Sequence, residues 1–159
     1  MSDISEDEDS VAVQVGVPLA PAAAWDLFVT RFDAWWPREY TFCGEALAEI
    51  GIDAQADGQC YERAQSGEKI VWGTVIEAAA PQGLMFHWHI GPDRNIDTKP
   101  ERSSTVTVHF AASDHGTTVT LVHGDLANHG DDGLAYRAAM ASEQGWPYCL
   151  EHFRAAAGG

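Results

Sequence analysis

Residues 146–153 read WPYCLEHF and predict a helix with one apolar face. Its large apolar side chains recur at i, i+3, i+4 and i+7, which is the stripe of an amphipathic helix. They are Trp146, Cys149, Leu150 and Phe153. Pro147 suits the first turn of this helix. Gly145 separates it from the Ala-rich segment DDGLAYRAAMASEQ, which is also compatible with a helix. The apolar face of residues 146–153 needs an apolar surface to pack against.

That surface is expected to be a sheet, because residues 46–124 consist of short apolar runs separated by turns. The runs are rich in β-branched and aromatic residues, as strands are. They are ALAEI, QCYERA, KIVWGTVIEA, LMFHWHI, TVTVHFAA and TTVTLVH. Turn-forming pairs such as Asp57-Gly58 and Ser66-Gly67 lie between them, which indicates an antiparallel meander. Parallel βαβ units are not expected, since no long helical pattern interrupts the runs.

The N-terminal part predicts one further strand and one or two short helices. Residues 11–17, VAVQVGV, alternate in polarity with the period of a half-buried strand. Residues 20–32 carry a second stripe with helical spacing, formed by Trp25, Phe28, Val29 and Phe32. Pro37 is expected to end a short second helix that contains Trp35 and Trp36.

The sequence therefore predicts one α+β domain over residues 11–159, with an antiparallel sheet of about six strands and a C-terminal helix. A length of 159 residues fits a single domain. Residues 1–10 are rich in acidic side chains and predict a disordered tail.

The charge of the chain argues against several classes of partner. Twenty-four acidic residues face nine basic ones, giving a formal net charge of −15. Such a surface repels phosphate backbones and anionic lipid, so we expect no nucleic-acid partner and no membrane partner. The sequence has no long apolar run and no secretory signal, and its three cysteines are dispersed, so we expect a cytoplasmic protein.

Motifs for catalysis or metal binding are not apparent. The sequence has no G-x-S-x-G elbow, no H-E-x-x-H pair and no Gly-rich phosphate loop. His87 and His89 share one face of their predicted strand, and His109 lies on the polar face of another. Solvent-facing histidines are more common than a metal site built from such residues. We therefore expect no metal and no cofactor.

Four phrases carry a resemblance to a known superfamily. They are PAAAWDLFVTRFDAWWP, GTVIEAAAPQGLMFHW, SSTVTVHF with GTTVTLVHGDL, and GWPYCLEHF. In this order they resemble the START-like helix-grip superfamily, also called SRPBCC, and its branch named after the activator of the heat-shock chaperone ATPase. The resemblance implies a curved antiparallel sheet that wraps around a long C-terminal helix, with a cavity between the two.

Large aromatic residues on predicted inward faces are the candidates for this cavity, together with one histidine. The candidates are Trp35, Trp36, Trp72, Trp88, His123, Trp146 and Phe153. One of Trp35 and Trp36 is expected to pack inward and the other to lie at the cavity rim; the alternative is that both are core residues. His123 shares the apolar face of its strand, and three roles are open to it. It would anchor a polar group of a ligand, or act as an acid–base. The third role is that of a core histidine, satisfied by a backbone carbonyl or by the following turn.

The leading hypothesis for function is noncatalytic binding of a small apolar or amphipathic molecule between the sheet and the C-terminal helix. One alternative is a protein-interaction module of a co-chaperone-like or regulatory kind, with a protein partner or a homodimer. The other alternative is an enzyme on an aromatic or polyketide-like substrate, with His123 as the acid–base.

Overall fold

The computed structural model describes residues 10–158; residues 1–9 of the expected acidic tail and residue 159 lie outside them. Seven antiparallel strands form one sheet in the order β1-β7-β6-β5-β4-β3-β2, where about six were expected. The strands are β1 (Val11–Val17), β2 (Leu47–Ile52), β3 (Gln59–Ala64), β4 (Lys69–Ala79), β5 (Gly83–Trp88), β6 (Ser104–Ser113) and β7 (Gly116–Gly124). The chain thus runs as a meander from β2 to β7, and β1 pairs with β7 at the opposite edge.

Helical segments occur where the sequence predicts them at residues 20–32, in the Ala-rich segment and at residues 146–153. The expected short helix containing Trp35 and Trp36 is wrong, because a 3-10 turn ends at Ala34 and Pro37 disfavours helical geometry at Trp36. The α-helices are α2 (Pro21–Trp25), α3 (Gly133–Ala141) and α4 (Trp146–Ala156). The segment after α2 is π-helical, and the other short helices are 3-10 turns: η1 (Asp26–Thr30), η2 (Phe32–Ala34), η3 (Arg38–Tyr40), η4 (Gly44–Ala46), η5 (Pro100–Arg102) and η6 (Leu126–His129). No helix within residues 10–158 is long and apolar enough to cross a membrane.

The break between α3 and α4 requires the glycine that the sequence places there. A Cβ atom on Gly145 would lie 2.2 Å from the backbone oxygen of Met140. That distance is far inside van der Waals contact, so any larger residue would displace the end of α3. Pro147 follows in the first turn of α4, where its missing N–H costs no hydrogen bond.

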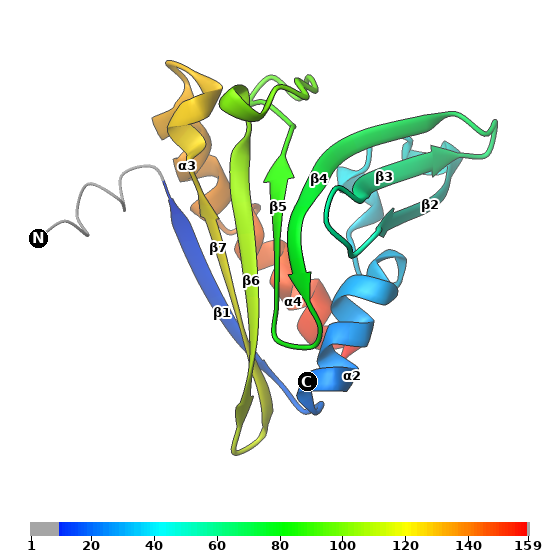
Figure 1. Ribbon diagram of the computed structural model, residues 1–159, viewed down its shortest axis with the longest axis vertical. Coiled ribbons are helices and arrows are strands. Elements are labelled where there is room, and N and C mark those ends of the chain that lie inside the picture. The colour runs from blue at the N-terminus through cyan, green and yellow to red at the C-terminus, as the bar shows by residue number, and fades with distance from the viewer. Residues whose placement is uncertain (1–9, 159) are drawn as a thin grey trace, which may run out of the picture.

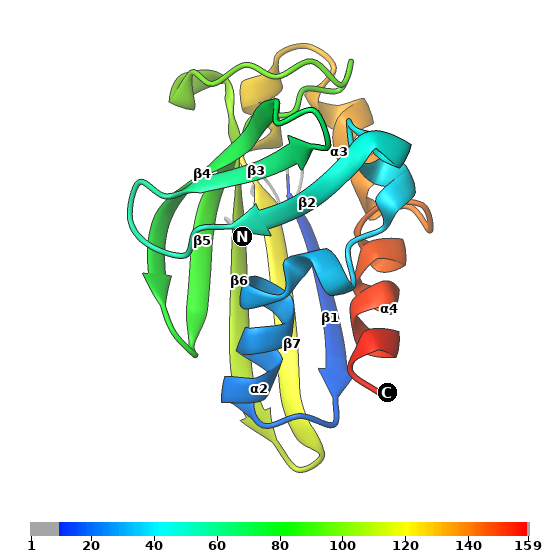
Figure 2. The same ribbon diagram turned by 90° about the vertical axis from the view of Figure 1, so that its right-hand side faces the viewer.

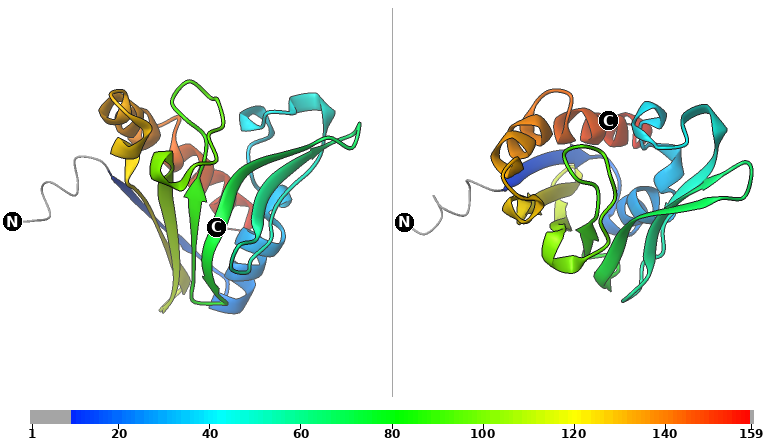
Figure 3. Two further views of the ribbon diagram at one scale, coloured as in Figure 1. Left: turned by 45° about the horizontal axis from the view of Figure 1, so that its top comes forward. Right: turned by 90° about the horizontal axis from the view of Figure 1, so that it is seen from above.

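The sheet is curled into a half-barrel, and α2 and α4 lie on its concave side (Figures 1 and 3). β2 and β3 run crosswise to β6 and β7 (Figure 2), because the strand pairs in this part of the sheet contain bulges that bend it. The register shifts lie between Leu47 and Glu49, between Cys60 and Tyr61, and between Val75 and Glu77. The bend moves β2 and β3 away from the start of α4.

The core lies between the sheet, the N-terminal helical segments and α4. Phe28 is at its centre, with ring contacts to Phe110 of β6, Phe153 of α4 and Trp35. The predicted apolar face of α4 is buried in full, since Trp146, Cys149, Leu150 and Phe153 are each at most 4% exposed. Burying one large apolar side chain contributes about 1.5–3 kcal/mol, so burial of this face stabilises the packing of α4 against the sheet.

The expected solvent exposure of His89 is wrong. β5 ends at Trp88, so the strand alternation stops before His89, whose side chain is 2% exposed. The Oγ of Ser103 lies 2.6 Å from His89 Nδ1, and the Oγ1 of Thr74 lies 2.9 Å from His89 Nε2. Burial lowers the pKa of His89 to about 4, so the ring is neutral and joins the loop after β5 to β4.

Candidate ligand-binding site

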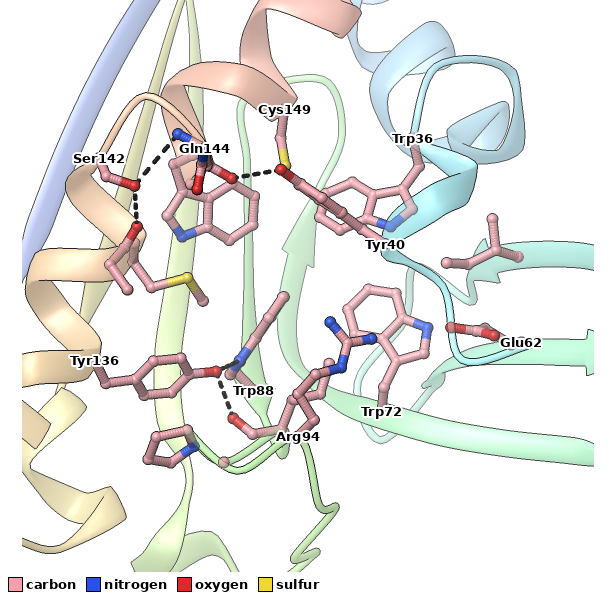
Figure 4. A pocket seen from close by; sticks show the side chains of 18 residues that line it. Trp36, Tyr40, Glu62, Trp72, Trp88, Arg94, Tyr136, Ser142, Gln144 and Cys149 are labelled. Atoms are coloured by element: carbon pink, nitrogen blue, oxygen red, sulfur yellow. Dashed lines mark hydrogen bonds between the residues drawn. The ribbon is translucent and has the colours of Figure 1, made fainter. Parts of the chain in front are cut away.

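A pocket of about 340 Å³ lies between the bent half of the sheet and the helices α3 and α4 (Figure 4). Its walls come from β2 to β5, the loop after β5, α3, the α3–α4 connection, the first turn of α4 and the segment around η3. This volume falls within the range of ~300–1,000 Å³ that is usual for small-molecule sites. Six aromatic side chains dominate the lining: Trp36, Tyr40, Trp72, Trp88, Tyr136 and Trp146.

The four tryptophans of the pocket form a closed circuit of ring contacts, which we call the tryptophan ring. Trp72 contacts Trp88 with centroids 5.7 Å apart, and Trp88 contacts Trp146 at 5.5 Å. Trp36 completes the circuit, at 5.8 Å from Trp146 and 6.5 Å from Trp72. Because these residues come from four different segments, their mutual packing fixes the shape of the apolar wall.

The other three candidates lie behind this wall and are absent from the pocket lining. Trp35 is 3% exposed, and its indole N–H donates to the backbone oxygen of Phe28 at 3.2 Å. Phe153 is fully buried and packs against Trp35 and Phe28. The adjacent Trp35 and Trp36 therefore point to different sides, with Trp35 in the core and the half-buried Trp36 on the pocket wall.

His123 is fully buried, and both of its ring nitrogens are engaged. The indole N–H of Trp146 donates to His123 Nδ1 at 2.9 Å. Nδ1 is therefore the acceptor, so Nε2 carries the proton and donates to Ser104 Oγ at 2.7 Å. The Ser104 hydroxyl in turn donates to His129 Nε2 at 2.8 Å. The partners of His123 are thus side chains, and not the backbone carbonyl or the following turn that one of its three expected roles would require.

This environment does not support the hypothesis that His123 is an acid–base. Burial is the main reason that the pKa of His123 falls to about 3, so the ring stays neutral at physiological pH. The side chain also lies outside the pocket lining and has no nitrogen free for a substrate. Its role in the fold is to hold the indole of Trp146 in the tryptophan ring.

Tyr136 is a pocket residue that the sequence reasoning missed. Its hydroxyl donates to the backbone oxygen of Ile90 at 2.7 Å and accepts the indole N–H of Trp88 at 2.8 Å. Tyr136 thereby joins α3 to the loop after β5 and orients Trp88. Burial raises the pKa of Tyr136 to about 12, which keeps the hydroxyl protonated. The available signal was that Tyr136 is the one aromatic residue within the small-residue helix GLAYRAAMA.

One polar atom of the pocket wall lacks a partner. The indole nitrogen of Trp72 is buried and has no hydrogen-bond partner among residues 10–158. Leaving a buried donor unsatisfied costs about 1–3 kcal/mol, so such groups are uncommon. The indoles of Trp88 and Trp146, by contrast, donate to Tyr136 and His123. The Trp72 nitrogen is closed to the pocket as well, since it is buried, so the Trp72 indole contributes apolar contact to the wall.

Glu62 holds the segment that covers one side of the pocket. This β3 residue is 2% exposed, and its two carboxylate oxygens accept the backbone N–H groups of Phe42 and Cys43, both at 2.9 Å. Two backbone N–H dipoles therefore stabilise the buried negative charge. Strand alternation alone does not identify this role, because Phe42 and Cys43 lie about twenty residues away in the sequence.

The comparisons with known proteins begin with a family assignment. The sequence model described as "Activator of Hsp90 ATPase homolog 1-like protein" matches residues 19–158. The chain belongs to this family. The resemblance inferred from the four sequence phrases is therefore confirmed. The sequence matches none of the proteins that have curated descriptions.

Solved structures share the fold of this family member over nearly the whole chain. A protein of Nitrosomonas europaea has a TM-score of 0.66 at 13% identity and covers 95% of both chains. An anthrahydroquino-gamma-pyrone synthase has a TM-score of 0.64 at 26% identity, covering 94% of this chain and 98% of its own. The self-sacrificing resistance protein CalC of Micromonospora echinospora has a TM-score of 0.63 at 25% identity and covers 95% of both chains.

Two titratable side chains that line the pocket of this family member are held in their protonated forms. Cys149 lines the pocket, but burial raises the pKa of its thiol to about 12. A thiol with such a pKa is protonated at neutral pH and is a poor nucleophile. Tyr136 is likewise held protonated. What these groups offer to a ligand is apolar contact and hydrogen bonding.

Proposed function

We propose that this protein binds a small aromatic molecule, apolar or amphipathic, in the pocket bounded by the tryptophan ring, and that it does so without catalysing a reaction on it. The observation that carries this proposal is the wall of four mutually contacting indoles around a pocket of about 340 Å³. The flat indole faces would pack against the rings of a bound aromatic molecule.

The relatives support an aromatic ligand. The fold of this family commonly binds hydrophobic ligands. The synthase at 26% identity has a name that describes a fused aromatic product, an anthrahydroquino-gamma-pyrone. A pocket walled by four indoles suits the same class of flat molecule, because aromatic rings gain about 0.5–1.5 kcal/mol per ring pair beyond their buried area.

The distribution of apolar surface favours a pocket ligand over a docked protein. Among the residues that the structure describes, Ile76 is the one large hydrophobic residue that is exposed, at 38%. A protein-docking face would present a contiguous apolar patch on the outside of the molecule. The large aromatic side chains here are instead gathered around the pocket and in the core behind it.

A pair of neighbouring substitutions tests the proposal. Ala139 is exposed on α3 and lines the pocket, whereas Ala138 is also exposed but does not line it. The uncharged dye N-phenyl-1-naphthylamine, which fluoresces in apolar surroundings, is the probe. We expect the native protein and Ala138→Trp to bind the dye, and Ala139→Trp to lose binding because the added indole occupies the pocket. Equal binding by both variants, or none by the native protein, would contradict the proposal.

A further inference from the structure

Arg94 has a backbone conformation that its residue type disfavours. Its φ angle is 67°, in the left-handed region. Asp57 and Asp125 are the other non-glycine residues with positive φ in residues 10–158, and aspartate tolerates this region far better than arginine does. The turn around Arg94 is fixed by hydrogen bonds from its own N–H to Gly91 and from Gly91 N–H to Asn95. Glycine or asparagine would suit this position better for folding alone.

The side chain of Arg94, whose backbone adopts this unfavourable conformation, lines the pocket. The guanidinium of Arg94 lies 5.3 Å from the centre of the Phe42 ring, which is the contact expected of a cation over an aromatic face. Figure 4 shows the side chain projecting from the loop after β5 toward the pocket. Glu62 holds the backbone of Phe42 in turn, so a buried hydrogen bond positions the ring on which Arg94 rests.

The positive charge of Arg94 is not neutralised within the described part of the chain. Five arginines form ion pairs there, namely Arg31, Arg38, Arg63, Arg102 and Arg154, and Arg94 forms none. Arg137 forms none either, but its guanidinium donates to the backbone oxygen of Ser10 at 2.9 Å. The adjacent carboxylate of Asp93 accepts hydrogen bonds from the backbone and side chain of Asn95. The carboxylate of Glu62 is occupied by two backbone N–H groups.

We propose, as an extension of the proposed binding function, that the ligand is an aromatic anion and that Arg94 binds its acidic group. The positively charged guanidinium attracts the acidic group of the ligand at the pocket wall, while the tryptophan ring packs against the aromatic part of the ligand. An arginine fork can donate two parallel hydrogen bonds to a carboxylate or a similar oxyanion, which adds orientation to charge. The same group adds no affinity for a neutral molecule of equal shape.

Two dyes with the same aromatic skeleton distinguish the effect of ligand charge on affinity from the effect of ligand shape. The dye 8-anilinonaphthalene-1-sulfonate carries a sulfonate, and N-phenyl-1-naphthylamine lacks it. In Arg94→Gly we expect the affinity for the sulfonate dye to fall by about tenfold or more, and the affinity for the neutral dye to change by less than about twofold. The melting temperature is not expected to fall, because glycine adopts the left-handed backbone without strain.

Arg102→Ala is the matched control. It removes one positive charge from the same long loop, but Arg102 does not line the pocket. We expect it to leave both affinities unchanged. Equal losses for the two dyes in Arg94→Gly, or an unchanged affinity for the sulfonate dye, would overturn the role of Arg94 while the pocket function stands. If neither dye binds the native protein, or if Ala139→Trp leaves both bound, the proposed function itself fails.

Discussion

The indole N–H of Trp146 and the Nδ1 atom of His123 are joined by a buried hydrogen bond of 2.9 Å. This contact ties the first turn of α4 to the end of β7, across twenty-three residues of sequence. One face of the Trp146 indole belongs to the pocket wall, and its nitrogen belongs to the buried network that continues through Ser104 to His129. Pocket shape and core stability therefore depend on the same side chain.

Trp146→Phe is expected to destabilise the protein beyond the loss of packing area. The substitution removes the donor and leaves His123 Nδ1 buried without a partner, a cost of about 1–3 kcal/mol. Chemical denaturation of the variant measures this cost. Trp25→Phe is the control, since Trp25 is also buried but lies away from His123. Equal destabilisation in the two variants would show that the hydrogen bond contributes nothing of its own.

Trp72→Phe and Trp88→Phe are expected to differ in their effect on the ligand-free protein. Both remove an indole from the tryptophan ring, but only Trp88 donates a hydrogen bond to a described residue, Tyr136. The free energy of unfolding should therefore fall by about 1 kcal/mol more for Trp88→Phe than for Trp72→Phe. Urea denaturation checks the order. A reversed order would mean that the Trp72 indole has a partner in solution.

Glu62→Gln is expected to destabilise the protein and to loosen the segment over the pocket. An amide keeps one acceptor, but its NH2 group faces the second backbone N–H, so the expected cost is about 1–3 kcal/mol. Hydrogen exchange at the amides of Phe42 and Cys43 should accelerate. Glu49→Gln, which alters an exposed ion pair with Arg63, should cost less than about 1 kcal/mol. Unchanged exchange at both amides would contradict the assigned role.

Stability is expected to decrease as the pH falls from about 6.5 to about 4. The pKa of His89 is lowered to about 4 and that of His123 to about 3, so in this range the unfolded chain binds protons that the folded chain excludes. Each such histidine contributes a slope of up to about 1.4 kcal/mol per pH unit. Removing the imidazole in His89→Gln should make the measured slope shallower by up to about 1.4 kcal/mol per pH unit. A slope equal to that of the native protein would refute the burial effect.

Local sequence patterns predicted most of the fold because they report on single elements. The i, i+3, i+4, i+7 stripe of Trp146 to Phe153 became the buried face of α4, and the alternation in residues 11–17 became β1. The same reasoning failed at His89, because the strand ends one residue earlier and alternation no longer applies. Strand ends depend on pairing with neighbours, which a local pattern does not contain.

Several pocket residues could not be predicted from local patterns, because contacts between distant segments place them in the pocket. Trp36, Trp72, Trp88 and Trp146 were candidates by size and face, but Tyr136, Glu62 and Arg94 were not. Tyr136 is a partner of Ile90 forty-six residues away, and Glu62 is a partner of Phe42 twenty residues away. Arg94 combines a left-handed backbone with a position opposite Phe42. These relationships exist only once the sheet has bent.

The sequence by itself determined the order of the main helices and strands, the apolar faces of the helices and the family. It did so because periodicity and residue type act over a few neighbouring positions. The tertiary structure alone decided that Trp35 lies in the core and Trp36 on the pocket wall, and that His123 is occupied by Trp146 and Ser104. Strand bulges and long-range hydrogen bonds set these positions, and both arise from packing among segments that are far apart in the chain.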